Sequence, residues 1–283
     1  MAYPSFQNTD GNSELYAPLV TAAQFAAYEQ SVARQVVTIF DAPLNTGKSL
    51  QVPVWSALAA EIITDESTST LVNTGSSSAS IDLAEHVVYR KISDMLRDSA
   101  FSNVLSNLGD NAGRAIAESL DTQVFSKFSS LSGSSTAIAL ASFTKDDIMD
   151  RVATLRANKI TGPFICVIHP TAANAIKKAL TATTAYTASG PTADGILQNY
   201  FVGQLAGCTI IESSLVPYAS GTGIATCAVF SPSALGHAMR GGIELETMRS
   251  VKDRATELSV KAVAGATVLQ ASHGVLMNID LVA

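Results

Sequence analysis

Residues 41–55 read DAPLNTGKSLQVPVW, and this stretch decides between two kinds of fold. Its first half nearly spells the phosphate-binding loop of nucleotide hydrolases, with Ala42 in place of the first glycine and Lys48 at the position of the lysine. That loop works only where a helix begins at its Gly-Lys-Ser end, because the helix amides then face the phosphates. Here the following residues are β-formers, and Pro53 would remove a backbone donor early in any helix. The stretch therefore predicts a turn at residues 45–47 that opens a β-strand.

The predicted strand has a partner further along the chain. Apolar residues recur there at even spacing, as in a half-exposed strand: Ile81, Leu83, Val87 and Tyr89. Between the two strands lies a tip of small polar residues at 67–80. Residues 49–89 contain no lysine or arginine but carry five acidic residues, Glu61, Asp65, Glu66, Asp82 and Glu85. Because a two-stranded ribbon is marginally stable in water, we expect this acidic hairpin to lie on a neighbouring subunit.

The longest helical pattern follows the hairpin. Its apolar residues are three or four positions apart: Leu105, Leu108, Ala112, Ile116, Leu120, Val124 and Phe128. They predict a helix from Asp98 to Phe128, about 45 Å long. Gly109 and Gly113 each cost about 1 kcal/mol inside a helix, which allows a bend or break there.

Beyond a loop at 131–136 the pattern alternates between helix and strand. Thr144 and Asp147 form a capping box that begins a helix with Ile148, Val152 and Leu155 inward and its end near Asn158. The next predicted elements are a buried strand at 163–168, a helix from Pro170 with Ala173, Ile176 and Leu180 inward, and strands at 208–211 and 225–230. From Gly236 onward β-patterns dominate, at 243–248, 258–269 and 275–281.

The composition predicts association between copies of the chain. Of its 283 residues 15% are charged, against about 25% in an average soluble domain. A chain with so few charges has little with which to cover its surface, so we expect obligate oligomers. The net charge of −6 disfavours a protein that reads nucleic-acid sequence.

Cysteines and targeting signals add further limits. The widely spaced Cys166, Cys208 and Cys227 lie in apolar runs, which predicts buried free thiols. No apolar run approaches the roughly 18 residues that span a membrane, and residues 1–15 lack the pattern of a signal peptide. We therefore expect a cytoplasmic protein with no membrane partner.

No constellation of residues indicates catalysis or metal binding, so we predict no catalytic, cofactor-binding or metal site and no cofactor. His86 alternates within the hairpin and is interpreted as a surface residue, while His169, before Pro170, is given a local capping or packing role. His237 and His273 are isolated. No acidic residue ends an apolar strand where it would hold magnesium for Lys48, which disfavours a nucleotide hydrolase.

Several segments, taken in order, resemble the major capsid proteins of tailed bacteriophages with the Hong-Kong-97-like fold. They are VPV at 52–54, RKISDMLRDS at 90–99, IHP at 168–170, VGQLAG at 202–207, SLVP at 214–217 and VFSPSA at 229–234. The resemblance spans about residues 30–283, and it rests on the order and spacing of the segments.

The resemblance implies an α+β fold of five parts. These are an N-terminal arm at 1–46, an extended β-hairpin loop at 47–90, a peripheral domain with a spine helix at 91–140, an α/β axial domain at 141–235, and a return to the peripheral domain at 236–283. In this family the extended loop lies across the adjacent subunit, which would give the acidic hairpin its support. We hypothesise that Glu61, Asp65 and Glu66 pair there with Arg90, Lys91 or Arg97 of the next copy.

The function implied is that of a structural, non-enzymatic major capsid protein. It would assemble through hexamers and pentamers into an icosahedral phage head that encloses double-stranded DNA without specific contacts. It would be assembled in the host cytoplasm and reside in the virion, with separate scaffolding, portal and decoration proteins as partners.

Two departures from the family pattern modify this expectation. Some members cross-link covalently through a lysine in the extended loop, whereas the lysine here, Lys48, sits at the base of the loop, so no cross-link is expected. No long helical leader precedes the arm, so scaffolding is expected from a separate protein or from a leader that was removed before residue 1. The alternatives are an encapsulin-type nanocompartment shell, which shares the fold, and a nucleotide hydrolase that uses Lys48.

Overall fold

A computed structural model describes Ala23 and residues 31–43, 47–55, 75–95, 104–181 and 204–282. The helices of this part are α2 (Ala33–Val36), α4 (Val104–Phe125), α5 (Lys145–Ala157) and α6 (Pro170–Thr181), with short 3-10 turns η1 (Ser126–Ser130), η2 (Leu140–Ser142), η3 (Pro232–Ala234) and η4 (Ala271–His273). The strands are β1 (Thr38–Asp41), β2 (Ser49–Trp55), β3 (Ser76–Asp82), β4 (Ala84–Ser93), β5 (Ile138–Ala139), β6 (Phe164–Ile168), β7 (Gln204–Leu205), β8 (Cys208–Glu212), β9 (Tyr218–Ala219), β10 (Ile224–Phe230), β11 (Leu235–Ser250), β12 (Ala255–Val268) and β13 (Gly274–Asp280).

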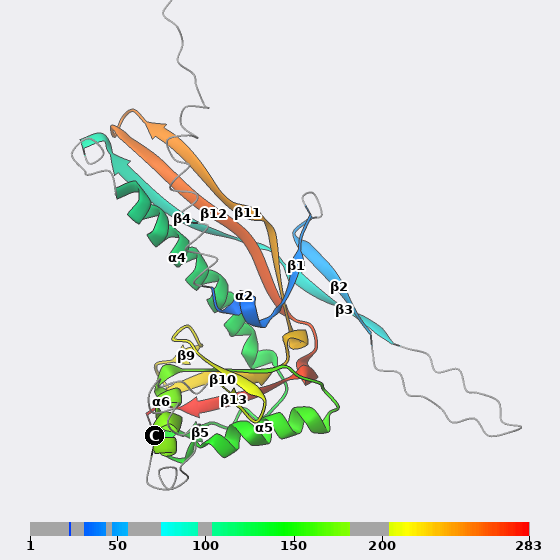
Figure 1. Cartoon of the computed structure of the whole chain (residues 1–283). Helices are drawn as coiled ribbons and strands as arrows, with labels where there is room; N and C mark the ends of the chain where they lie inside the picture. The colour runs from blue at the N-terminus through cyan, green and yellow to red at the C-terminus, as the bar shows by residue number, and fades with distance from the viewer. Residues whose placement is uncertain are drawn as a thin grey trace, which may run out of the picture.

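A long four-stranded sheet, in the order β1-β11-β12-β4, forms one part of the molecule. β11 and β12 are antiparallel from Leu235 opposite Val268 to Ser250 opposite Ala255, with one irregularity between Arg240 and Glu244. α4 runs along one face of this sheet (Figure 1). Alternate strand residues face the helix and build a core with Ala112, Ile116, Leu120, Leu258, Val260 and Ala262.

The second part is a mixed sheet in the order β5-β13-β10-β6-β8-β7, with β9 beside β10 and helices α5 and α6 (Figure 1). All five residues of β6 are buried, as the apolar run predicts. α5 begins at the predicted capping box, where the Thr144 backbone N–H donates to Asp147 Oδ2 over 2.9 Å. Cys166, Cys208 and Cys227 are buried free thiols of this sheet, which confirms their prediction.

α4 connects the two cores. Its first turns pack in the core of the four-stranded sheet, whereas Val124 and Phe125 at its end belong to the core of the second sheet. There Phe128 lies 5.3 Å from Phe125 and 5.5 Å from Phe230, measured between ring centroids. One continuous helix thus holds the two sheets together.

The predicted long helix is confirmed over Val104–Phe125, and it continues as η1 to Ser130. Gly109 and Gly113 lie inside it without a break. Gly113 has a packing role, because a Cβ at this position would lie 2.3 Å from the carbonyl oxygen of Ala23. The residues before Val104 back to position 96 lie outside the described part.

Two strand assignments from the sequence are wrong in their partners. The strand predicted over residues 81–89 as the partner of β2 is two strands. Only its first part, β3, pairs with β2, whereas β4, with Val87 and Tyr89, pairs with β12 as an edge of the four-stranded sheet. The segment 236–283 does not stay in one sheet either: β11 and β12 share the four-stranded sheet, but β13 pairs with β10 in the other. The alternation of apolar residues along a strand shows which residues share a face. It does not identify the neighbouring strand, because pairing is decided by tertiary contacts.

Candidate assembly surface

The hairpin of β2 and β3 leaves the four-stranded sheet (Figure 1), and most of its apolar residues lie on one side of it. We call this side the apolar stripe; it consists of Leu50, Val52, Val54, Ala79 and Ile81, which the pairing register places on one face. Ile81 is fully buried at the base of the hairpin, whereas Val52 and Val54 are only half-buried. On the other face Trp55 is 66% exposed. A two-stranded ribbon with exposed apolar surface needs further surface to pack against.

The base of the hairpin is held in one orientation by backbone contacts. Gly265 in β12 lies so close to the hairpin that a Cβ there would be 2.3 Å from the Asp82 carbonyl oxygen. The backbone N–H of Leu83 donates to the carbonyl of Lys48 over 2.8 Å. The guanidinium of Arg240 donates to the carbonyl of Gly47. Lys48 therefore stands at the start of a strand, as predicted, with no helix after it to form a phosphate site.

The face of the four-stranded sheet away from α4 is a second exposed surface, which we call the open face. Three large apolar side chains are exposed on it: Val87 (52%), Tyr89 (56%) and Met248 (65%). Between them Lys261 Nζ lies 3.2 Å from Glu244 Oε2 and 2.5 Å from Glu246 Oε1. Surfaces that bind a protein partner in one defined register combine exposed apolar side chains with charge pairs in this way.

Lys91, one of the cations proposed to receive the acidic hairpin, has partners within its own chain. Its ammonium pairs with Asp253, and Glu257 Oε1 lies 3.8 Å away. The hydrogen bond between Lys91 and Asp253 raises the pKa of Lys91 and lowers the pKa of Asp253. Arg90 is exposed on β4, whereas Arg97, Glu61, Asp65 and Glu66 lie outside the described residues. The proposed pairing between subunits remains a prediction.

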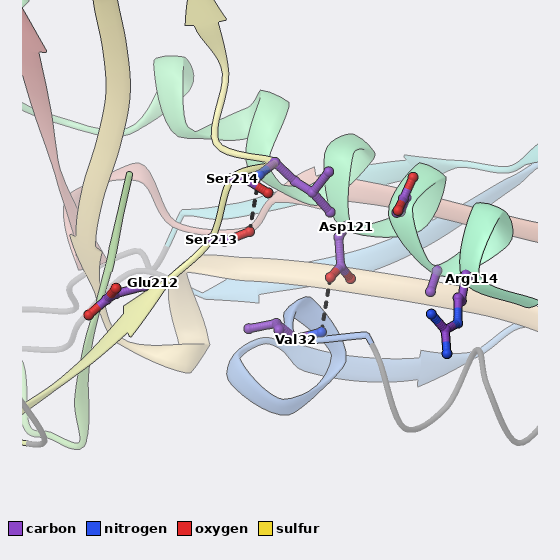
Figure 2. A pocket seen from close by; sticks show the side chains of 9 residues that line it. Val32, Arg114, Asp121, Glu212, Ser213 and Ser214 are labelled. Atoms are coloured by element: carbon purple, nitrogen blue, oxygen red, sulfur yellow. Dashed lines mark hydrogen bonds between the residues drawn. The ribbon is translucent and has the colours of Figure 1, made fainter. Parts of the chain in front are cut away.

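The end of the N-terminal arm is fastened to α4 by a buried carboxylate. Asp121 accepts hydrogen bonds from the Ser31 hydroxyl (2.7 Å) and from the backbone N–H groups of Val32 (2.9 Å) and Ala33 (3.2 Å). Burial raises the pKa of Asp121 against the opposing effect of these donors. Beside it lies a cavity of about 250 Å³, lined also by Arg114, Glu118 and the turn Glu212–Leu215 (Figure 2). The segment just before α2, helix α4 and the second sheet meet here.

The histidines occupy four separate environments. The capping role predicted for His169 is confirmed: its Nδ1 accepts from the Thr171 N–H over 3.3 Å at the start of α6. His86 is half-buried against α4, with Nδ1 2.7 Å from Ser119 Oγ, so its interpretation as a surface residue is wrong. His273 Nδ1 lies 2.7 Å from Ser233 Oγ, and His237 is buried in β11.

Among the described residues, no group of three or more His, Cys, Asp or Glu side chains is placed to hold a metal ion. In the same part of the chain, no helix combines the length and apolar character that crossing a bilayer requires. The notable features of the described residues are instead two exposed surfaces, the apolar stripe and the open face, and the buried contact of segment 31–33 with Asp121.

Solved structures with the same architecture include phage capsids. The capsid of cyanophage P-SCSP1u superposes with a TM-score of 0.66 at 17% identity, covering 86% of each chain. The head of Helicobacter pylori bacteriophage KHP40 gives 0.67 at 11% identity, over 87% of this chain and 88% of that one. A virus-like particle from Pyrococcus furiosus gives 0.59 at 14% identity, over 93% and 99%. The architecture is the Hong-Kong-97-like capsid fold.

The family follows from the sequence comparison. The family model for phage capsid protein matches residues 79–276 of this chain. No curated protein matches it. The chain belongs to the phage capsid protein family, and this family and fold point to a structural shell protein of the virion.

Proposed function

We propose that this chain is the major capsid protein of a tailed phage, and that it assembles through hexamers and pentamers into an icosahedral head around double-stranded DNA. The observation that carries the proposal is the apolar stripe, whose outer residues Val52 and Val54 are half-exposed on a ribbon of two strands. Burying this stripe on a neighbouring copy removes apolar surface from water at about 25 cal/mol per Å². The hairpin is stable in a shell and marginal outside it.

The geometry favours a repeated, directional contact. The hairpin projects to one side of the sheet, so the copy that donates it and the copy that receives it use different surfaces. Contacts of this head-to-tail kind form rings when the rotation between copies closes. The open face, with Val87, Tyr89 and Met248 exposed, is the surface that we assign to receive a neighbour. Its charge pairs are exposed and screened by solvent, so they would set the register of the contact more than its strength.

In this proposal the parts of the chain take the roles of the resembling family. The hairpin β2–β3 is the extended loop, α4 with the four-stranded sheet is the peripheral domain, and the sheet containing β6 and β10 is the axial domain. Scaffolding, portal and decoration proteins are separate chains, and assembly takes place in the host cytoplasm. A low proportion of basic residues suits a container, because a strongly basic lining would bind DNA and oppose its movement.

Electron microscopy of the full chain, expressed alone and then with scaffolding partners, tests the proposal. We expect closed shells, partial shells or sheets of hexamers in at least one of the two conditions. A boiled, reduced gel of the particles should give one band at the monomer mass, because the loop lysine needed for a cross-link is absent. Small soluble species in both conditions would contradict the proposal.

A second candidate is a nanocompartment shell that holds protein cargo. The same fold occurs in the Pyrococcus furiosus virus-like particle, which is not described as a phage head, so the fold alone does not separate the two candidates. Purified particles distinguish the two: nuclease-protected double-stranded DNA supports the phage head, and a stoichiometric cargo protein supports the compartment.

Replacing Lys48 with alanine tests the remaining enzymatic alternative. Because Lys48 is exposed and contacts Leu83 through its backbone carbonyl, Lys48→Ala should change the free energy of unfolding by less than about 0.5 kcal/mol. We expect the variant to assemble as the native chain does, and neither protein to hydrolyse ATP. ATP turnover that disappears in the variant would restore the hydrolase.

A further inference from the structure

A buried histidine occupies the place where the arm meets the four-stranded sheet. His237 in β11 is 1% exposed, and among the described residues neither of its ring nitrogens has a hydrogen-bond partner. Its cross-strand neighbours are apolar, Ile39 in β1 and Ala266 in β12. A buried polar ring without partners is costly even when neutral, and a charged ring in the same place costs far more.

The groups around His237 make its charged form still less favourable. Arg34 of α2 and His86 of β4 are the titratable groups that act on it. His86 is itself held against α4 by Ser119, which carries no charge to offset a protonated ring. Four elements, α2, β4, α4 and β11, thus meet around a polar joint that already contains one cation.

We propose that this joint is an acid-labile latch, which holds the N-terminal arm on the spine helix and the sheet only while His237 is uncharged. The latch has two contacts for the arm. Arg34 of α2 acts on His237 through its charge, and Ser31 and Val32, just before α2, donate hydrogen bonds to Asp121. Opening the joint would free both contacts, and with them the segment that precedes β1.

The direction of the pH dependence follows from the pKa of His237. Burial, with smaller effects from Arg34 and His86, lowers this pKa from 6.5 to about 4. Between these two values an opened joint takes up a proton that the closed joint refuses, so acid favours opening. The equilibrium constant for opening the joint should rise about tenfold for each pH unit of acidification, or roughly 300-fold over the whole interval.

The other titratable groups, His86 and Asp121, differ in whether their protonation favours or opposes opening of the joint. Burial lowers the pKa of His86 as well, so its protonation adds to opening in the same direction. Burial raises the pKa of Asp121, so its protonation favours the closed, buried form and opposes opening in acid. Loss of the arm on acidification would therefore point to the histidines.

Hydrogen–deuterium exchange of the full-length chain, corrected for intrinsic rates, tests the latch between pH 7 and 4. Peptides that cover residues 31–41 and 235–240 should lose protection progressively as the pH falls from 6.5. Peptides from α5 and β6 should keep theirs. Unchanged protection of 31–41 across this range, or simultaneous loss in α5 and β6, would overturn the proposal.

Two non-titrating variants, His237→Phe and His237→Gln, locate the effect. In whichever of them folds, the protection of residues 31–41 should vary less than about threefold across the interval. Asp121→Asn is the matched control: it removes the group whose protonation opposes opening in acid, so protection should still fall with pH and at least as steeply as in the native chain. His273→Gln, far along the chain in η4, should behave as the native protein does. A native slope in both His237 variants would contradict the latch.

Discussion

A chain that carries both Val52→Asp and Val54→Asp is expected to fold as the native chain does and to form no shells. Both side chains belong to the apolar stripe and are half-buried in the isolated subunit, on a hairpin that projects from the sheet. Each carboxylate would be buried at every copy of the contact, at a cost of several kcal/mol if it stays charged (on the order of 2–5). Electron microscopy and sedimentation of the purified chain measure the loss.

The matched control places the same two charges on the opposite face of the hairpin. Gln51 and Ser78 are exposed and point away from the stripe, so Gln51→Asp with Ser78→Asp should still assemble. The melting temperature of the unassembled control should stay within about 3 °C of the native chain, since exposed substitutions change stability by only about 0.5 kcal/mol, and the stripe variant, whose two valines are half-buried, should still unfold cooperatively. If the control pair abolishes assembly and the stripe pair does not, the hairpin binds its neighbour through the other face.

Local patterns were sufficient to predict most elements of the fold. Pro53 and the β-formers around it correctly exclude the helix that a phosphate loop requires, and β2 occupies these residues. The capping box at Thr144 and the apolar run at 164–168 correctly locate α5 and β6. These signals succeed because capping and buried strands depend on residues that are close in sequence.

The pairing of strands was beyond local patterns. Tyr89 and Ile81 share one alternating run, yet β3 pairs with β2 and β4 pairs with β12. The extended backbone leaves strand geometry only at Leu83, where the chain passes from the hairpin into the four-stranded sheet. Alternation marks which residues share a face, whereas the partner is chosen by contacts with residues more than a hundred positions away.

The hairpin surface could also be predicted from local sequence, whereas the contacts of His237 and Asp121 could not. The acidic, unsupported hairpin was visible in the sequence, because its composition and period are local. His237 was only an isolated histidine in a β-pattern, since only the fold brings Arg34, about two hundred positions earlier in the chain, and His86 of β4 near enough for their charges to act on it. Asp121 likewise stands in a helical pattern as an ordinary acidic residue, and only the fold brings Ser31 to it.

Gly265→Val is expected to be the most damaging single substitution in the sheet. Gly265 is buried in β12, and any Cβ there would lie 2.3 Å from the carbonyl oxygen of Asp82 and 3.0 Å from Ile81 Cγ2. The first of these atoms belongs to the backbone, so no change of rotamer relieves the contact. The base of the hairpin must lift, which breaks the Leu83–Lys48 hydrogen bond and exposes Ile81.

We expect this change to lower the free energy of unfolding by about 3 kcal/mol or more, because overpacking, a lost hydrogen bond and exposure of an isoleucine add together. The corresponding fall in melting temperature is roughly 6–12 °C, measured on the unassembled chain. Gly221→Ala is the control, since a Cβ at Gly221 has no atom within 4 Å. The variant should also fail to assemble, because a lifted hairpin no longer presents its apolar stripe in the native direction. Equal stability of the two variants would mean that the hairpin base yields without cost, and the direction of the hairpin would then have to be set by the neighbouring subunit.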